Sequence, residues 1–311
     1  MNEQMDHTFY ADRAWHGSVR VTENVRLARD THRVRFSCPD IARKILPGQF
    51  IMLRLAEGND PLLGRPLALY DVATGTDGKP DGLDIVYLTV GKMTRRLAAI
   101  EPEAKLEIWG PLGNGFPVER TEHLIMVAGG IGQTPFLALA SEYLGLRQYG
   151  DPPRSVPRAE RITLCYGVRS AEYLAGVADF ERLGVDVRLS TDDGSMGHRG
   201  LVTELIEPVV KAAENRCSRG AGLRPANLNA GETPALVRIV CCGPEPMLKA
   251  TAEIALRLGV SCQVSLETPM ACGMGICFSC AAKIRDASGG WDYRRTCVEG
   301  PVFNAADVEF D

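Results

Sequence analysis

The first third of the chain alternates short hydrophobic runs with turn residues. Runs with the length and the β-branched or aromatic content of strands cover residues 18–27, 34–37, 50–55, 67–73 and 83–90. Gly and Pro separate these runs, as at Pro47-Gly48, and one short helix is predicted over residues 95–100 with Thr94 as its N-cap. Many short strands with frequent turns indicate an antiparallel barrel or sandwich.

The hydrophobic pattern changes beyond residue 118. Continuous apolar runs alternate here with helical patterns, which is typical of a parallel sheet buried on both faces. The predicted strands are 124–128, 161–167, 185–190 and 237–242, and the predicted helices are 136–146, 171–183, 201–213 and 247–258. This alternation predicts an α/β domain with a doubly wound parallel sheet. Residues 215–234 are rich in Gly, Pro and Asn and are predicted to be a surface insertion.

A third pattern begins at residue 263. Predicted strands at 263–266, 281–285 and 291–295 flank a loop rich in glycine and cysteine. The sequence therefore predicts a multidomain protein. Its parts are an N-terminal arm (1–16), an antiparallel β-barrel (17–118), an α/β domain with the insertion (119–262) and a small C-terminal segment (263–311).

Composition and charge argue against several classes of protein. The 311 residues are 45% hydrophobic and 24% charged, which is ordinary for a globular protein. The net charge of −4 gives no electrostatic reason to expect a nucleic acid or an anionic membrane as partner. No apolar run reaches the roughly 18 residues of a membrane span, and the polar N-terminus lacks the features of a secretory signal. We therefore expect a cytoplasmic protein.

The cysteines fall into two groups. Six lie outside the C-terminal loop, mostly in apolar runs, and are interpreted as reduced core residues: Cys38, Cys165, Cys217, Cys241, Cys242 and Cys262. The other four are Cys272, Cys277, Cys280 and Cys297. The first three have the spacing C-x4-C-x2-C, and sixteen residues separate the third from the fourth. Plant-type ferredoxins bind a 2Fe-2S cluster with this spacing. Structural zinc is the alternative, but zinc sites usually show two C-x2-C pairs and this segment has one.

Further stretches have the chemistry of phosphate sites. Arg65 beside Pro66 could direct its guanidinium at a diphosphate, and residues 86–94 run from a strand through a Gly turn into a helix. Each of these signals is weak by itself. Residues 129–135 (GGIGQTP) join a buried strand to a helix, although they do not match G-x-G-x-x-G. Ligands bind at the carboxyl ends of parallel strands, so 129–134, 167–170 and 242–247 should share one rim.

Together these motifs resemble the ferredoxin–NADP reductase superfamily, and within it the electron-transfer subunits of B-type dihydroorotate dehydrogenase. The resemblance covers residues 15–311 apart from the insertion, and it is most specific in the tail, which reads ETPMACGMGICFSCAAKI and then TCVEGPVF.

The resemblance implies roles for individual positions. The residues implied to bind FAD are Arg65, Pro66, Leu67, Ala68, Val86, Tyr87, Leu88, Met93 and Thr94. Those implied to bind the nicotinamide dinucleotide are Gly129, Gly130, Gly132, Gln133, Thr134, Cys242, Gly243, Pro244 and Met247. Cys272, Cys277, Cys280 and Cys297 are implied to hold the 2Fe-2S cluster. Ala68 replaces the usual Ser and Met93 a common Gly, so details of flavin binding differ from the family pattern.

The implied function is electron transfer. NAD(H) exchanges two electrons as a hydride and a 2Fe-2S cluster exchanges one, so a flavin must stand between them. The resemblance implies a partner, an FMN-containing dihydroorotate dehydrogenase catalytic subunit of pyrimidine biosynthesis, in a heterotetramer. A reductase for an oxygenase, a hydrogenase or a sulfur-reducing complex is the alternative, and a zinc-stapled binding module without redox chemistry is another. The choice between NAD and NADP depends on whether Arg169 meets a 2′-phosphate, which the sequence leaves open, and Cys242 is interpreted as lining the site rather than as a nucleophile.

Overall fold

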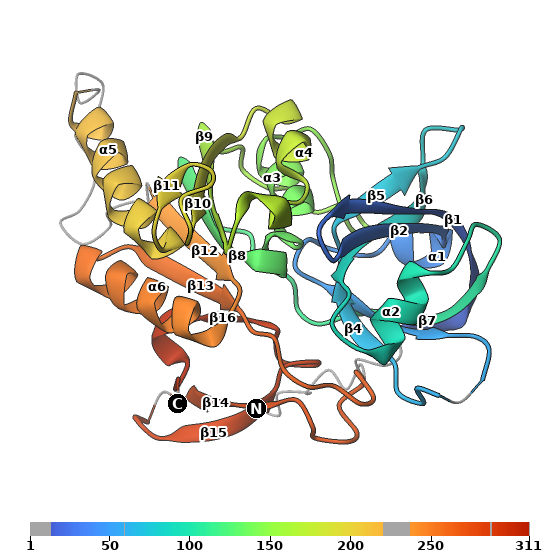
Figure 1. Cartoon of the computed structure of the whole chain (residues 1–311). Helices are drawn as coiled ribbons and strands as arrows, with labels where there is room; N and C mark the ends of the chain where they lie inside the picture. Colours follow the sequence, from blue (N-terminus) through green and yellow to red (C-terminus); the bar gives the residue numbers. More distant parts are fainter. Residues whose placement is uncertain (1–13, 59, 220–236, 287, 311) are drawn as a thin grey trace.

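The computed structural model describes residues 14–58, 60–219, 237–286 and 288–310, with the side chains of 214–219 excepted. A curled antiparallel sheet, a layered α/β region and a small C-terminal hairpin follow one another along the chain (Figure 1). Residues 1–13 of the predicted arm and 220–234 of the predicted insertion lie outside the described residues, whereas 215–219 end a helix. Within the described residues, no helix is both long and apolar enough to cross a membrane.

The N-terminal region is an antiparallel sheet with the strand order β4-β3-β7-β1-β2-β6-β5. Its strands are β1 (Trp15–Ala28), β2 (Thr31–Ser37), β3 (Phe50–Leu55), β4 (Arg65–Ala68), β5 (Asp71–Thr74), β6 (Pro80–Leu88) and β7 (Lys105–Leu112). The edge strands β4 and β5 are nearly consecutive in the chain. Between them the Leu69 N–H donates to the Gln49 carbonyl beside β3, and the Tyr70 N–H donates to the Asp84 carbonyl of β6. This short connection curls the sheet into a half-barrel (Figure 1).

Several predictions for this region were wrong in detail. The predicted strand 67–73 is divided, because its two halves pair with opposite ends of the sheet. Thr94 is not the N-cap of α2 (Lys92–Ala98); Gly91 is, and the Thr94 hydroxyl accepts the Val90 and Gly91 N–H groups at 3.1 and 3.2 Å. The sequence does not predict β7 or the short helix α1 (Pro39–Ala42).

The central region is a sheet with the order β11-β10-β9-β8-β12-β13-β16, parallel except for β16. Its strands are β8 (His123–Gly129), β9 (Arg161–Val168), β10 (Asp186–Thr191), β11 (His198–Arg199), β12 (Val237–Cys242), β13 (Ser261–Ser265) and β16 (Val302–Asn304). The helices are α3 (Phe136–Tyr143), α4 (Val177–Arg182), α5 (Ile206–Arg219) and α6 (Glu245–Leu258). The predicted parallel sheet is therefore confirmed.

Both faces of this sheet are covered, which explains the continuous apolar runs. On β8, Leu124 and Met126 pack into the core under α3 and α4, whereas Ile125 and Val127 pack into the core under α5 and α6. Figure 1 shows the two helix pairs on opposite faces. The predicted helix 171–183 is broken, because Gly176 has a left-handed φ of 73° between a single 3-10 turn and α4.

The C-terminal segment is joined to the sheet at both of its ends. It enters from β13, forms the cysteine loop and the hairpin of β14 (Ala281–Arg285) and β15 (Trp291–Arg295), and returns as β16, which pairs antiparallel with β13. The boundary proposed between residues 262 and 263 thus falls inside β13, so it does not separate two independent parts of the sheet.

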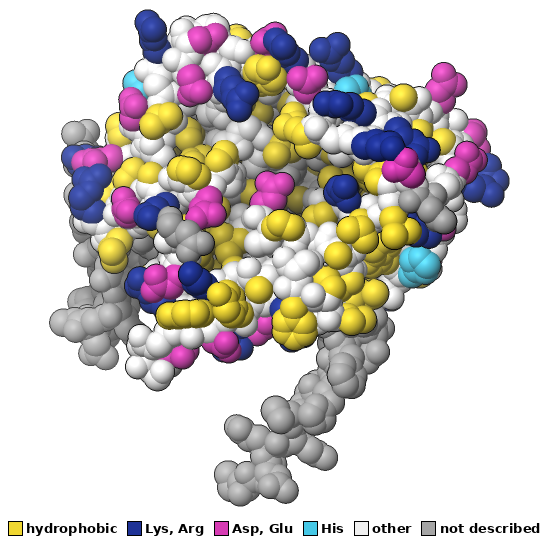
Figure 2. All heavy atoms as spheres, turned by 60° about the horizontal axis from the view of Figure 1, so that its bottom comes forward, with side chains coloured by type: hydrophobic (Ala, Val, Ile, Leu, Met, Phe, Trp, Pro, Cys, Tyr) yellow, Lys and Arg dark blue, Asp and Glu magenta, His cyan; other side chains and the backbone are white. Residues whose placement is uncertain are grey.

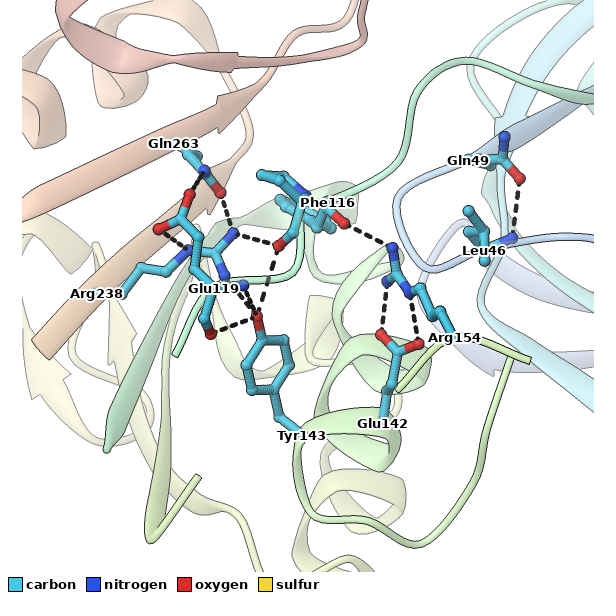
Figure 3. A network of polar contacts seen from close by, with 10 residues as sticks. Leu46, Gln49, Phe116, Glu119, Glu142, Tyr143, Arg154, Arg238 and Gln263 are labelled. Carbon is cyan, nitrogen blue, oxygen red and sulfur yellow. Dashed lines mark hydrogen bonds and ion pairs between the residues drawn. The ribbon is translucent and has the colours of Figure 1, made fainter. Parts of the chain in front are cut away.

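A buried arginine fixes the connection between half-barrel and sheet (Figure 3). Arg238 on β12 is fully buried, and its guanidinium donates to the Tyr143 hydroxyl at 2.7 Å and the Pro117 carbonyl at 3.2 Å. It also donates to the Gln263 side chain and pairs with Glu119 at 3.5 Å. Buried charges of this kind need several partners, and the connecting residues Pro117 and Glu119 provide two of them.

A second ion pair lies beside the first. Arg154 forms a two-pronged contact with the buried carboxylate of Glu142 on α3, at 2.6 and 2.7 Å, and donates to the Phe116 carbonyl at 2.8 Å (Figure 3). The connection between the two regions is therefore held from two sides, which fixes the half-barrel relative to the sheet.

Candidate functional site

The four cysteines of the C-terminal loop lie in two pairs. The Cys280 and Cys297 sulfurs are 3.2 Å apart and buried, whereas Cys277 is exposed and Cys272 half-buried. The thiols of Cys272 and Cys277 are close enough to interact. Each iron of a 2Fe-2S cluster takes two protein ligands, so two thiol pairs match its needs.

Protonation differs between the two pairs. The Ser279 hydroxyl, 3.1 Å from the Cys277 sulfur, and the neighbouring Cys272 lower the pKa of Cys277 to about 6. Burial, with Cys280 close by, raises the pKa of Cys297 to about 12. Only thiolates bind iron, so assembly of a cluster must release a proton from the buried pair.

Glycines allow the loop to come close to its surroundings. Gly273 and Gly275 have left-handed φ values of 70° and 80°. A Cβ on Gly273 would lie 2.5 Å from Met52 Cγ, and one on Gly275 would lie 2.6 Å from Val298 Cγ2. The Met274 N–H donates to the Cys272 sulfur at 3.3 Å. Such a cradle of backbone N–H groups suits the sulfur atoms of an iron–sulfur cluster.

The same geometry does not favour a single zinc ion. Across the part of the chain that the structure describes, no three His, Cys, Asp or Glu side chains converge closely enough to hold one metal ion. A zinc site needs four ligands around one centre, whereas the thiols here form separate pairs. The residues thus fit a two-iron cluster better than a structural zinc.

The predicted flavin residues fall on three elements of the half-barrel. Arg65, Pro66, Leu67 and Ala68 form β4 and are half-buried, so their side chains remain accessible to a ligand. The strand β4 lies near β6, across the seam of the half-barrel. Among the described residues, the Arg65 guanidinium donates to the carbonyls of Leu63 and Gly64, both at 3.0 Å, and to no carboxylate.

The remaining flavin candidates are occupied by contacts within the protein. Val86 and Met93 are buried in hydrophobic cores, and the Tyr87 hydroxyl, also buried, donates to the Asn24 side chain at 3.1 Å. Thr94 holds the start of α2. These residues could therefore meet a flavin mainly through their backbone, and Leu88 through its half-buried side chain.

A cleft of about 830 Å³ lies between the half-barrel and the carboxyl ends of the parallel strands. Predicted nicotinamide residues that line it are Gly129, Gly130, Gly243, Pro244 and Met247. Gly167, Val168 and Arg169 line it too, which confirms the predicted rim of strand ends. Leu88 joins it from the flavin set.

Four other predicted residues lie behind the cleft wall instead. They are Gly132, Gln133, Thr134 and Cys242, none of which lines the cleft. Gly132 packs directly on the end of β12, where its own Cβ would lie 2.1 Å from the Cys242 carbonyl oxygen. Gln133 is fully buried, and both polar atoms of its amide lack a hydrogen-bonding partner within the described residues. Gly132, Gln133 and Thr134 belong to the turn that follows Gly129, and Cys242 ends β12 beside it.

The Cys242 thiol is protonated at neutral pH. Burial, and then the Glu267 carboxylate, raise its pKa to about 12. This agrees with the interpretation that Cys242 is not a nucleophile, since a thiol reacts through its thiolate.

The half-barrel side of the cleft is formed by residues that the sequence patterns did not single out. Asp30, Thr31, Thr89 and Val90 line it opposite the strand ends, and so does Glu267, the residue that precedes the cysteine loop by five positions. Asp30 has a left-handed φ of 54° in the β1–β2 turn, a conformation that Asp tolerates better than most residues. An Asp in a turn between two predicted strands can be recognised in the sequence. Only the fold shows that this turn faces the ends of the parallel strands.

Comparisons with known proteins match the half-barrel and the cysteine loop to two known kinds of domain. Residues 18–116 match the oxidoreductase FAD-binding domain, and residues 267–309 match the iron–sulfur cluster binding domain of dihydroorotate dehydrogenase B. The solved structure of an NADH-dependent reduced ferredoxin–NADP oxidoreductase, obtained in work on flavin-based electron bifurcation, is similar with a TM-score of 0.70. It is 25% identical, and the match covers 94% of this chain and 90% of the other.

Full-length relatives are similar over nearly the whole sequence. The dihydroorotate dehydrogenase B (NAD(+)) electron transfer subunit of Caldanaerobacter subterraneus subsp. tengcongensis is 33% identical, over 95% of this chain and 99% of its own length. The subunit of the same name from Desulforamulus reducens is 32% identical, over 92% and 95%. This chain therefore belongs to the family of dihydroorotate dehydrogenase B electron transfer subunits.

Proposed function

We propose that this chain carries electrons between NAD(H), FAD and a 2Fe-2S cluster, and exchanges them with an FMN-containing dihydroorotate dehydrogenase catalytic subunit. The observation that carries this proposal is the adjacency of the two parts of the site. Glu267 lines the cleft at the strand ends, and the cysteine loop begins five residues later on the same segment. A nucleotide and a cluster would thus be held by one continuous stretch of chain.

Separate groups of residues bind the dinucleotide and the flavin. The glycine loop at the end of β8 offers backbone N–H groups to the dinucleotide, and Arg65 offers a guanidinium to the flavin diphosphate. The flavin, when bound, accepts a hydride and releases electrons singly, which neither of the other carriers can do. The Gly243 to Met247 segment, packed on Gly129, holds the opposite wall of the cleft in place.

The exposed side of the cysteine loop is the place where electrons pass between this chain and its partner. Cys277 is exposed, and the neighbouring Ile276 and Phe278 are 74% and 63% exposed. Figure 2 brings this end of the molecule forward and shows hydrophobic side chains gathered across it. Cys277 is the candidate cluster ligand nearest to solvent, and an apolar surface around it suits a protein partner. We propose a heterotetramer with the catalytic subunit, in the cytoplasm, where free thiols such as those of the apolar core remain reduced.

The test is anaerobic purification of the tagged chain from its host, followed by analysis of cofactors and bound proteins. The expected result is FAD and two irons per chain, an FMN protein that oxidises dihydroorotate, and NAD+ reduction by the complex. Recovery of both cofactors with a different redox partner would favour the reductase for another acceptor. Material with neither iron nor flavin would contradict electron transfer altogether.

A further inference from the structure

The indole of Trp109 connects the half-barrel to the cysteine loop through a hydrogen bond. Trp109 lies on β7, and its Nε1–H donates to the Cys272 carbonyl at 2.8 Å, across 163 positions of sequence. Cys272 is the first of the cysteines in the loop. The contact therefore connects the half-barrel directly to a thiol-bearing residue.

The other end of the indole reaches the flavin side of the sheet. A Cβ on Gly64 would lie 2.8 Å from Trp109 Cη2, so the ring lies directly on the backbone of Gly64. Gly64 precedes Arg65, the first of the predicted flavin residues on β4. The ring therefore spans from the start of β4 to the cysteine loop.

The strand between β4 and β7 adds a second contact to the loop. On β3, Met52 is paired with Pro66 on one side and with Trp109 on the other. Met52 is fully buried, and its Cγ is the atom that a Cβ on Gly273 would meet at 2.5 Å. The loop thus rests on a packed surface of the half-barrel.

This surface continues to the buried thiol pair. Cys280 and Cys297 share a hydrophobic core with Phe50, Met52 and Leu112, against which Trp109 is packed. Close-packed side chains transmit small displacements, because few voids are available to absorb them. The position of the loop relative to β4 therefore depends on this contact.

We propose that Trp109 is a positioning residue for electron transfer, which sets the separation between the flavin held at β4 and the cluster held by the cysteine loop. This inference rests on the proposed function. The Trp109 N–H also directs its positive end at the Cys272 carbonyl, next to a cluster ligand. A positive partial charge beside a ligand residue would favour the reduced, more negative state of a bound cluster and so raise its potential.

The test is Trp109→Phe, which keeps an aromatic ring and removes the N–H donor. The matched control is Trp15→Phe on the adjacent strand β1, an identical change at a residue that packs on the main core of the half-barrel rather than on the core of Cys280 and Cys297. Both proteins are assayed for iron and FAD, for the cluster potential by a titration followed by electron paramagnetic resonance, and by stopped flow. Stopped flow separates flavin reduction by NADH from the cluster reduction that follows it.

We expect full cofactor content, unchanged flavin reduction and a more negative cluster potential in Trp109→Phe. Cluster reduction should slow several-fold, because the rate of electron transfer falls steeply as the separation between two carriers grows. Trp15→Phe should behave as the wild type. A wild-type potential and a wild-type rate of cluster reduction in Trp109→Phe would overturn the inference.

A second variant tests the inference in case Trp109→Phe loses its cluster. Gly64→Ala keeps the indole N–H but pushes the ring away from β4. If Trp109→Phe does not retain its iron, slower cluster reduction in iron-loaded Gly64→Ala supports the inference, and an unchanged rate overturns it. Absence of iron or flavin from the wild type would instead contradict the proposed function.

Discussion

Replacement of Gly132 by alanine should distort the cleft, although Gly132 does not line it. Gly132 lies in the 3-10 turn Gly130–Gln133 that follows β8. The added Cβ would lie 2.1 Å from the carbonyl oxygen of Cys242 and 2.5 Å from its carbonyl carbon. Both atoms belong to the backbone at the end of β12, so no side-chain rotation can relieve the overlap. The turn and β12 must move apart.

The size of the effect follows from this geometry. Ordinary van der Waals contact begins at 3.4 Å, so the turn has to shift by about 1 Å to restore normal packing distances. Overpacking of this kind costs about 1–3 kcal/mol of the free energy of unfolding. Each kcal/mol lowers the thermal midpoint of a domain of this size by about 2–4 °C. Gly129 and Gly130, which line the cleft, move with the turn, and an ångström of misplacement can slow hydride transfer by about 100-fold.

The assay combines thermal unfolding with the rate of flavin reduction by NADH. Gly259→Ala is the matched control, since Gly259 ends α6 with φ 67° and has open space around it. The left-handed backbone should cost this control about 1–2 kcal/mol of stability without altering flavin reduction. Wild-type stability together with wild-type flavin reduction in Gly132→Ala would refute the reasoning.

Three further outcomes can be checked. Arg238→Met should lower the free energy of unfolding in urea by about 3–5 kcal/mol, because it leaves buried partners unpaired. The exposed ion-paired Arg20→Met should lower it by less than about 1 kcal/mol, and equal losses would contradict this distinction. Cys242 should resist iodoacetamide at pH 7 and become reactive only as the pH approaches its pKa of about 12; labelling at the rate of the unfolded chain would show an accessible thiolate. Cys297→Ser should lose iron and the part of the visible absorption that the cluster contributes, whereas Cys165→Ser, buried in a core, should retain both.

The elements that the sequence predicted well are those with a strong local pattern. The strands β12, β14 and β15 begin and end at the predicted residues, because apolar or alternating runs are bounded there by turn residues. The prediction failed where one run serves two partners, as in the division of 67–73 into β4 and β5. It also failed for β16, whose three residues are too few to show a period.

The candidate site shows the same limit. The cysteine loop was recognisable because its spacing is local, and the rim of strand ends followed from a general rule for parallel sheets. The half-barrel wall at Asp30 and Thr31 could not be predicted, since it depends on how two regions are oriented. The contact between Trp109 and Cys272 joins residues too distant in sequence for any pattern to reveal.

The pairing of β13 with β16 means that the tail is not a detachable module. Gln263, Val264 and Ser265 on β13 are hydrogen-bonded on one side to β12 and on the other to residues that follow the last cysteine. A protein shortened after residue 262 would lose both outer strands and leave β12, a central strand that is apolar apart from Arg238, as a bare edge prone to self-association. Grafting the tail onto another reductase would require the recipient to offer a strand in the place of β12.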